Sequence, residues 1–144
     1  MLNFRTDLAS ERRDIYQKVQ GAEGELNGIE SQKEQINEKL SVERVKITNE
    51  EGEKAIGKPK GIYTTIDIKN LKIAQEEEIN KASEVLAKEL GDIISMHIDK
   101  QGEILVVGLG NESVTPDALG PKTINEIEVT RHFINYMPQY VKEG

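Results

Sequence analysis

Apolar residues recur at helical spacing in the first forty residues, and this predicts two amphipathic helices. In residues 8–19, Leu8, Ile15 and Val19 lie roughly on one face of a helix. In residues 29–40, two isoleucines and a leucine are separated by seven and then four positions, among Glu, Gln and Lys. This second pattern suits a solvent-exposed helix and is too short to indicate a coiled coil. The glycine-containing stretch between them, residues 21–28, is expected to be a loop.

A third helical pattern covers residues 74–90. Three glutamates near its start, residues 76–78, complement the positive end of a helix dipole. Gly91 is expected to end this helix, because glycine is favoured just beyond the last turn. The apolar positions that carry the pattern are Ile79, Ala82, Val85, Leu86 and Leu90.

Three segments have the composition of β-strands. Residues 42–48 alternate imperfectly between apolar and polar side chains, and residues 63–68 are rich in β-branched residues. Residues 104–109, Ile-Leu-Val-Val-Gly-Leu, form a continuous apolar run that is typical of a strand buried on both faces. Residues 49–52 and 57–61 are expected to be a turn and a loop.

This order of helices and strands predicts an α/β fold. We expect a mixed central sheet flanked by helices, with some parallel pairing around the buried strand at residues 104–109. The sequence contains no internal repeat.

Composition narrows the chemistry open to this chain of 144 residues. The absence of cysteine excludes disulfides, a thiolate nucleophile and cysteine-ligated metal sites within the chain. Its only histidines are His97 and His132, too few for a three-histidine metal site. The net charge of −7 argues against direct binding of nucleic acid or of an anionic membrane. We expect no cofactor and no metal.

The apolar run at residues 104–109 leads into the most informative stretch of the chain. Beyond it, Thr115 and Pro116 have the pattern of a helix start, which places Asp117 in the first turn. Ligands of open α/β sheets gather where strands end, so Asp117 is a candidate catalytic acid. The alternative is that Asp117 only complements the helix dipole.

Gly108, Gly110 and Asn111 form the loop before Asp117 and are candidate active-site residues. Their backbone N–H groups are suited to contact a substrate carbonyl oxygen. A phosphate-binding loop is the less favoured interpretation. The third glycine of the dinucleotide-binding motif and the Gly-Lys-Ser/Thr ending of a P-loop are both missing.

These residues resemble the spore germination proteases, endopeptidases that degrade small acid-soluble spore proteins. The resemblance implies that Asp117 is one of two essential aspartates of an atypical aspartic-type peptidase. No aspartate follows Asp117 here, so we expect an N-terminal fragment with little activity alone. Three segments carry the resemblance: Arg-Thr-Asp-Leu-Ala-Ser-Glu at residues 5–11, Gly-Lys-Pro-Lys-Gly-Ile-Tyr-Thr-Thr-Ile-Asp at 57–67, and residues 106–121, continued by Val-Thr-Arg-His at 129–132.

The same resemblance implies a zymogen that removes its own N-terminal segment. Proteases of this family cut after an acidic residue and before an apolar residue that is followed by alanine. Asp7 and Leu8 match this pattern, so residues 1–7 are expected to be a propeptide-like tail and residues 8–144 the N-terminal part of one peptidase domain. The alternative is that Thr6 or Asp7 simply caps the following helix.

Two further residues and several properties of the whole protein complete these expectations. Arg131 and His132 are candidates for orienting a substrate carboxylate, as arginine forks do. The chain has no secretory signal and no apolar run long enough to cross a bilayer, so a cytoplasmic protein is expected. The resemblance adds the forespore or spore core as the compartment, spore proteins as substrates and a homo-oligomer as the full-length state.

Two other functions stay open. The loop is also distantly similar to that of hydrogenase maturation endopeptidases, which implies a metal-dependent peptidase with Asp117 as a ligand. The second is a non-catalytic interaction domain.

Overall fold

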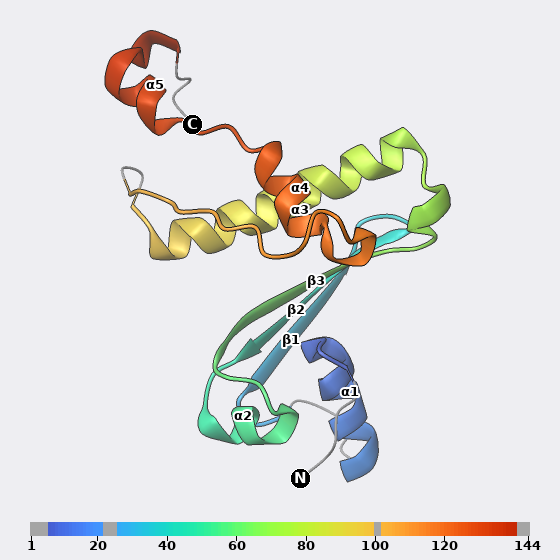
Figure 1. The fold of residues 1–144 in the computed structure, drawn as a ribbon. Coiled ribbons are helices and arrows are strands. Elements are labelled where there is room, and N and C mark those ends of the chain that lie inside the picture. Colours follow the sequence, from blue (N-terminus) through green and yellow to red (C-terminus); the bar gives the residue numbers. More distant parts are fainter. Residues whose placement is uncertain (1–5, 22–25, 100–101, 141–144) are drawn as a thin grey trace. The chain divides into compact units, whose positions relative to one another are not determined.

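The computed structural model describes residues 6–21, 26–99 and 102–140. The chain divides into an N-terminal unit, residues 1–97, and a C-terminal unit, residues 98–144 (Figure 1). Among the described residues, no helix has both the length and the apolar character needed to cross a membrane.

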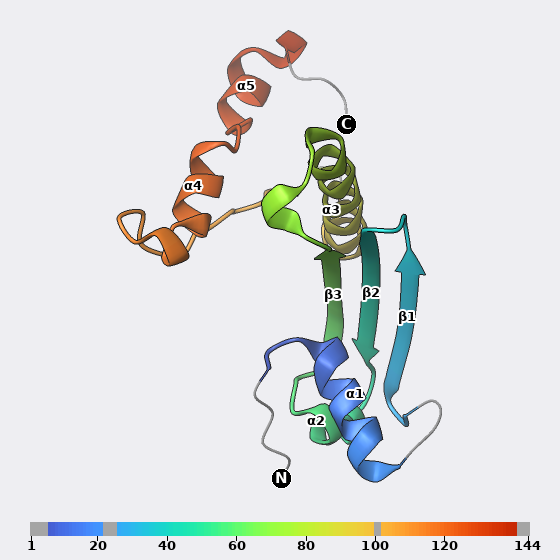
Figure 2. The ribbon, with the colours of Figure 1, turned by 90° about the vertical axis from the view of Figure 1, so that its right-hand side faces the viewer.

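The elements of the N-terminal unit in chain order are α1 (Ala9–Gln20), β1 (Ile29–Gln35), β2 (Leu40–Ile47), α2 (Glu50–Ile56), β3 (Gly61–Ile68), a 3₁₀ turn (Leu71–Ile73) and α3 (Glu76–His97). The three strands form an antiparallel sheet in the order β1-β2-β3. In β1 and β2, Ile29 pairs with Ile47, and in β2 and β3 Leu40 pairs with Ile68. Figure 2 shows the three strands side by side, with α1 and α2 near one end.

One cluster of buried apolar residues lies between one face of the sheet and the helices α1 and α2. Side chains alternate between the two faces along a strand, and Ile47, Val45 and the paired Ile29 share this face. Its centre is Ile56 at the end of α2, which is completely buried. Burying an isoleucine side chain contributes about 1.5–3 kcal/mol, so this small cluster anchors both helices. The cluster consists of Ala9, Ile29, Val45, Ile47 and Ile56.

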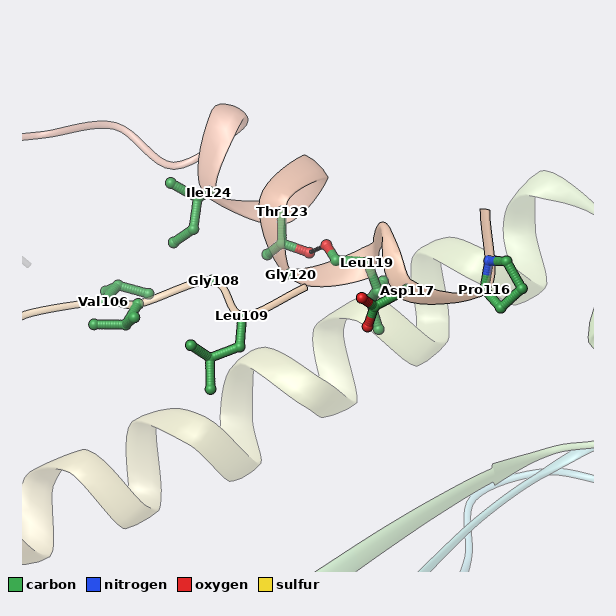
Figure 3. A pocket seen from close by; sticks show the side chains of 10 residues that line it. Val106, Gly108, Leu109, Pro116, Asp117, Leu119, Gly120, Thr123 and Ile124 are labelled. Atoms are coloured by element: carbon green, nitrogen blue, oxygen red, sulfur yellow. Dashed lines mark hydrogen bonds between the residues drawn. The ribbon is translucent and has the colours of Figure 1, made fainter. Parts of the chain in front are cut away.

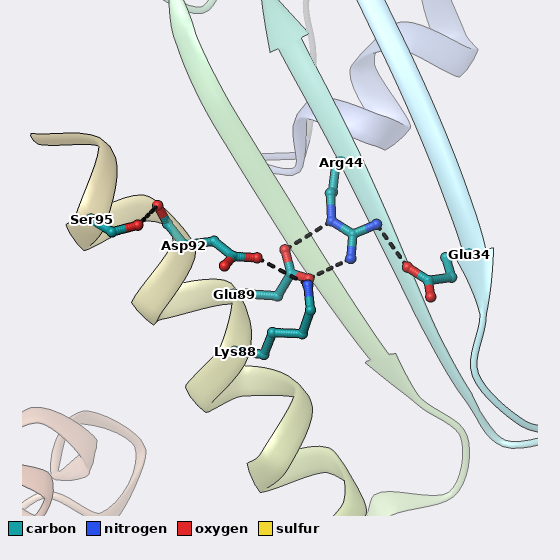
Figure 4. A network of polar contacts seen from close by, with 6 residues as sticks. All are labelled: Glu34, Arg44, Lys88, Glu89, Asp92 and Ser95. Atoms are coloured by element: carbon teal, nitrogen blue, oxygen red, sulfur yellow. Dashed lines mark hydrogen bonds and ion pairs between the residues drawn. The ribbon is translucent and has the colours of Figure 1, made fainter. Parts of the chain in front are cut away.

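The opposite face of the sheet is joined to α3 by an ion pair. Arg44 is next to Val45 in β2, so its side chain lies on the other face of the sheet. Its guanidinium contacts the carboxylate of Glu89 on α3 (Figure 4). The Arg44 Nε–Glu89 Oε2 distance is 2.9 Å, and Arg44 Nη1 lies 2.9 Å from Glu34 Oε2 on β1. The hydrogen bonds from Arg44 lower the pKa of the buried Glu89, and those same contacts raise the pKa of Arg44.

These elements confirm a sheet flanked by helices and most of the predicted periodicities. The helix predicted at residues 8–19 is α1, the strands predicted at 42–48 and 63–68 are β2 and β3, and the helix predicted at 74–90 is α3. Residues 22–25 of the predicted loop lie outside the described residues.

The helix predicted at residues 29–40 is wrong, since this segment forms β1 and the start of β2. Six of the seven residues of β1 are exposed, so little apolar burial selects its conformation. Cross-strand pairing selects it instead: Glu30 is paired with Lys46, and Lys33 with Glu43. Tertiary pairing has overridden the helix preference of Glu, Gln and Lys.

Two helix boundaries also differ from the prediction. The turn expected at residues 49–52 is the start of α2, where the Asn49 side chain caps the helix by accepting a hydrogen bond from Gly52 N at 3.0 Å. Gly91 does not end α3, which continues to His97. Nothing lies within 4 Å of the position where a Cβ on Gly91 would point, so packing around Gly91 does not interrupt the helix.

The C-terminal unit has helices and no strand among its described residues. The strand expected at residues 104–109 is therefore not found, and neither is any parallel pairing in the described chain. The run is also exposed rather than buried: Leu105 is 87% exposed and Leu109 81%. An apolar run predicts burial only where a second layer covers it. The elements are a 3₁₀ turn (Thr115–Asp117), α4 (Leu119–Asn125), α5 (Arg131–Tyr136) and a 3₁₀ turn (Pro138–Tyr140).

Candidate functional site

The candidate site is a cavity of about 380 Å³ within the C-terminal unit (Figure 3). One wall comes from the apolar run around Gly108, and the other from the 3₁₀ turn and α4. Among the described residues that line it, Asp117 is the only ionisable one. The lining residues are Val106, Val107, Gly108, Leu109, Pro116, Asp117, Leu119, Gly120, Thr123 and Ile124.

Glycines allow the two walls to approach each other closely. A Cβ at Gly108 would lie 2.3 Å from the carbonyl oxygen of Gly120, and one at Gly120 would lie 2.2 Å from that of Leu109. Gly110 has φ +141°, and a Cβ there would lie 2.0 Å from the Asp117 carbonyl oxygen. These distances are far below van der Waals contact, so the crossing of residues 108–110 over 117–120 requires these glycines.

Backbone hydrogen bonds fix Asp117 at this crossing. The amide of Asn111 donates to Asp117 O at 3.0 Å, and the amide of Asp117 donates to Val114 O at 2.8 Å. The side-chain oxygen of Asn111 accepts from the Ser113 amide at 3.0 Å, which tightens the same loop. Within the described residues, the Asp117 carboxylate has no hydrogen bond or ion pair, and Asp117 is exposed. The main chain thus holds Asp117 while its carboxylate is open to a ligand.

The structure brings the four predicted residues of this loop together within the C-terminal unit. Gly108 and Asp117 line the same cavity, while Gly110 and Asn111 shape the turn behind it. Thr115 does not cap a helix with its side chain as expected: it lies inside the 3₁₀ turn, for which Val114 occupies the cap position. The catalytic role of Asp117 stays a prediction.

Arg131 and His132 do not line this cavity. Arg131 Nη2 pairs with Glu103 Oε2 at 2.6 Å, and both side chains are exposed. The His132 ring packs against Phe133 with centroids 4.0 Å apart. Both residues lie at the start of α5, and their substrate-orienting role stays a prediction.

Asp7 and Leu8, the predicted processing site, belong to the N-terminal unit. Leu8 has extended backbone angles and occupies the cap position of α1 without a side-chain cap. Asp7 is fully exposed, whereas Ala9 and Ser10 are buried. Thr6 and Asp7 do not cap the helix: the Thr6 hydroxyl oxygen instead accepts from the Leu8 amide at 3.2 Å. Residues 1–5 of the propeptide-like tail lie outside the described residues.

Sequence reasoning missed the contribution of α4 to the cavity. Leu119, Gly120, Thr123 and Ile124 line it with the spacing i, i+1, i+4, i+5, which places them on one face of a helix. That spacing was readable in the sequence. The spacing alone does not show what this helix face packs against. The opposite wall is residues 106–109, which pair with no strand among the described residues.

No group of three or more His, Asp or Glu side chains in the described part of the chain is arranged to hold a metal ion.

Comparison with known proteins shows where the sequence belongs. The family model of germination proteases matches residues 6–144. A germination protease of Clostridium acetobutylicum is 41% identical over all of this chain and 43% of that protein. Those of Caldanaerobacter subterraneus and Priestia megaterium are 45% and 43% identical, over 96% and 99% of this chain and 40% and 39% of those proteins. The chain thus spans less than half the length of these curated relatives.

Proposed function

The chain belongs to the germination protease family, and we propose that the complete protein is an endopeptidase that degrades small acid-soluble spore proteins during germination. In this proposal it is made as a zymogen in the forespore and acts as a homo-oligomer. Residues 1–7 are its propeptide, removed at the Asp7–Leu8 bond. Residues 8–144 are the N-terminal part of the peptidase domain.

Asp117 is proposed to be one of the two catalytic aspartates. Peptide hydrolysis needs a base to activate water and an acid to protonate the leaving amine. Two neighbouring carboxylates divide this work, because their mutual repulsion separates their pKa values. No aspartate follows Asp117 in the sequence, so the second is expected in the part of the protein that this chain does not span.

The position of Asp117 supports this role. Among the described residues, it is the only ionisable one that lines the cavity, and its carboxylate makes no hydrogen bond or ion pair with them. Gly110 brings the opposite wall against the Asp117 carbonyl oxygen, while Gly108 and Gly120 allow the close approach of the two walls. Gly108, Gly110 and Asn111 are proposed to shape the loop that presents it, and Arg131 and His132 to orient a substrate carboxylate.

The test compares two acidic residues of the same loop in the full-length protein. Glu112 is exposed and does not line the cavity, so Glu112→Gln is the matched control for Asp117→Asn. Mass spectrometry follows cleavage of the peptide Arg-Thr-Asp-Leu-Ala-Ser-Glu. Asp117→Asn is expected to lower kcat/KM by at least about a hundredfold, the usual contribution of a general acid or base. Glu112→Gln should change it by less than about twofold, because a solvated charge outside the cavity is screened.

Three outcomes would contradict the proposal. Cleavage that persists in Asp117→Asn would remove Asp117 from the mechanism. Failure of the full-length protein to cut the peptide between Asp and Leu would reject the assigned specificity. Loss of activity on addition of a chelator would favour a metal-dependent mechanism instead.

A further inference from the structure

The side chain of Arg12 in α1 holds the chain just before the predicted processing bond. Its Nε donates to the carbonyl oxygen of Thr6 at 2.7 Å, and its Nη2 lies 3.4 Å from the carboxylate of Asp7. The Arg12 side chain is only 16% exposed although it belongs to a surface helix. Both contacts lie on the N-terminal side of the Asp7–Leu8 bond.

The same guanidinium binds the end of α2. Nη1 of Arg12 donates to Gly57 O at 2.9 Å and to Ile56 O at 3.3 Å. The last carbonyl groups of a helix have no hydrogen-bond partner within it and carry partial negative charge. A guanidinium there donates the missing hydrogen bonds and complements that charge. Since α1 and α2 pack against each other (Figure 2), Arg12 ties residues 6 and 7 to the core through α2.

The chain on the other side of the bond is held as well. Leu8 is followed directly by Ala9 and Ser10 of α1, which are 3% and 6% exposed. The Leu8 carbonyl oxygen accepts from the Arg12 amide at 3.1 Å, the first hydrogen bond of the helix. A peptidase takes up its substrate as extended chain on both sides of the bond. Cleavage here therefore requires the first turn of α1 to open and residues 6 and 7 to leave Arg12.

We propose that Arg12 is a latch that shields the Asp7–Leu8 bond in the folded precursor, so that release of Arg12 controls when this bond is cut. The identification of that bond rests on the proposed function. The latch itself does not, because any protease that needs residues 6–9 extended meets the same barrier.

The experiment uses the full-length precursor carrying Asp117→Asn, so that it cannot process itself, as a substrate. Arg12→Ala removes the latch, and Arg13→Ala is the matched control. Arg13 neighbours Arg12 on α1 but pairs with Asp14 and Glu43. Each precursor is digested by the processed enzyme and, separately, by an endoproteinase that cleaves before aspartate. Mass spectrometry measures the rate of cleavage after Asp7 by the processed enzyme and before Asp7 by the endoproteinase.

Arg12→Ala is expected to be cut about tenfold faster than the Arg13→Ala control by both proteases, since cleavage follows the population of the open state. Hydrogen exchange in β2 and α3 should be the same in both variants, which separates local opening from global unfolding. Equal cleavage rates of the two variants by both proteases would overturn the latch.

The free peptide Arg-Thr-Asp-Leu-Ala-Ser-Glu separates this inference from the proposed function. If the processed enzyme does not cut it, the proposed specificity fails. The latch would still be supported by faster cleavage before Asp7 in Arg12→Ala. If the peptide is cut but the two precursor variants are cut equally by both proteases, the latch fails and the proposed function stands.

Discussion

The buried side chains of the N-terminal unit are mainly apolar and come from its sheet and helices, whereas in the C-terminal unit Ala118 is the only buried residue among those described. In the N-terminal unit, Ile56 and Val42 are completely enclosed. In the C-terminal unit, the closest packing is between backbones, where residues 108–110 cross 117–120. Close backbone approach at a glycine also occurs in the N-terminal unit, where a Cβ at Gly52 would lie 2.4 Å from Gly28 O. The two units therefore differ mainly in side-chain burial, which is nearly absent from the described part of the C-terminal unit.

This difference shows why the candidate site lies in the less buried unit. Apolar burial makes a segment resistant to local opening, while a loop held by a few backbone contacts keeps its polar groups accessible. Asp117 is accessible because the structure holding it is main chain rather than packed side chains. Substitutions should therefore change stability by different mechanisms in the two units, through side-chain contacts in the first and through backbone approach in the second.

The largest effect is expected from Gly110→Ala in the C-terminal unit. The new Cβ would meet a backbone oxygen 2.0 Å away at a positive φ. Strain of this kind belongs to the small class of substitutions that cost about 4 kcal/mol or more. Hydrogen exchange should show loss of protection at the Asn111 amide, with β2 unchanged. Retained protection there would show that the crossing does not depend on this glycine.

In the N-terminal unit, Glu89→Gln should be the next most harmful change. It removes the charge from a buried partner of Arg44, and hydrogen bonds to charged groups contribute about 2 kcal/mol. Asp92→Asn on the same helix breaks only the exposed pair with Lys88 and should cost less than about 0.5 kcal/mol. Urea unfolding at pH 7 compares the two variants, and equal losses would contradict the importance of burial.

The effect of Glu89→Gln should depend on pH. Arg44 lowers the pKa of Glu89 in the folded state, so the stabilisation is present above the unfolded pKa of about 4.3. It is lost as the pH falls through the lower folded value. The difference in unfolding free energy between wild type and Glu89→Gln should therefore shrink below about pH 4. A difference that stayed constant down to pH 2 would exclude this linkage.

Asn49→Ala should cost about 1 kcal/mol, the usual cost of losing a helix N-cap. The substitution leaves the Gly52 amide without its side-chain acceptor at the start of α2. Asn49→Ser keeps an acceptor and should recover most of the loss. The measurement is hydrogen exchange within α2, and no difference between Ala and Ser would show that the cap contributes little.

The smallest effect, and the only gain, is expected from Gly91→Ala. This glycine lies inside α3 with open space around its missing Cβ, so alanine should stabilise the helix by about 0.5–1 kcal/mol. It is the counterpart of Gly110→Ala, with the same chemical change and the opposite sign. Thermal unfolding measures it, and a loss of stability would mean that Gly91 has a packing role in the protein.

Local periodicity was sufficient where one segment carries its own signal. The helices α1 and α3 and the strands β2 and β3 were predicted from spacing and composition. The strand β1 was not, since its polar residues take strand form only through pairing with β2. The short helix α2 was missed because residues 49–52, which contain its N-cap Asn49 and its first turn, also have the composition of a β-turn.

The sequence by itself determined that Asp117 lies beside a helix start after a glycine-containing loop, because proline fixes its own backbone angle while glycine permits conformations that other residues avoid. Only the tertiary structure decided that residues 119–124 form the second wall of the cavity and that Arg12 reaches from α1 to both Thr6 and Gly57. These contacts join different segments of the chain, and Arg12 and Gly57 are 45 positions apart in the sequence. They depend on how the elements pack, which no local pattern of residues encodes.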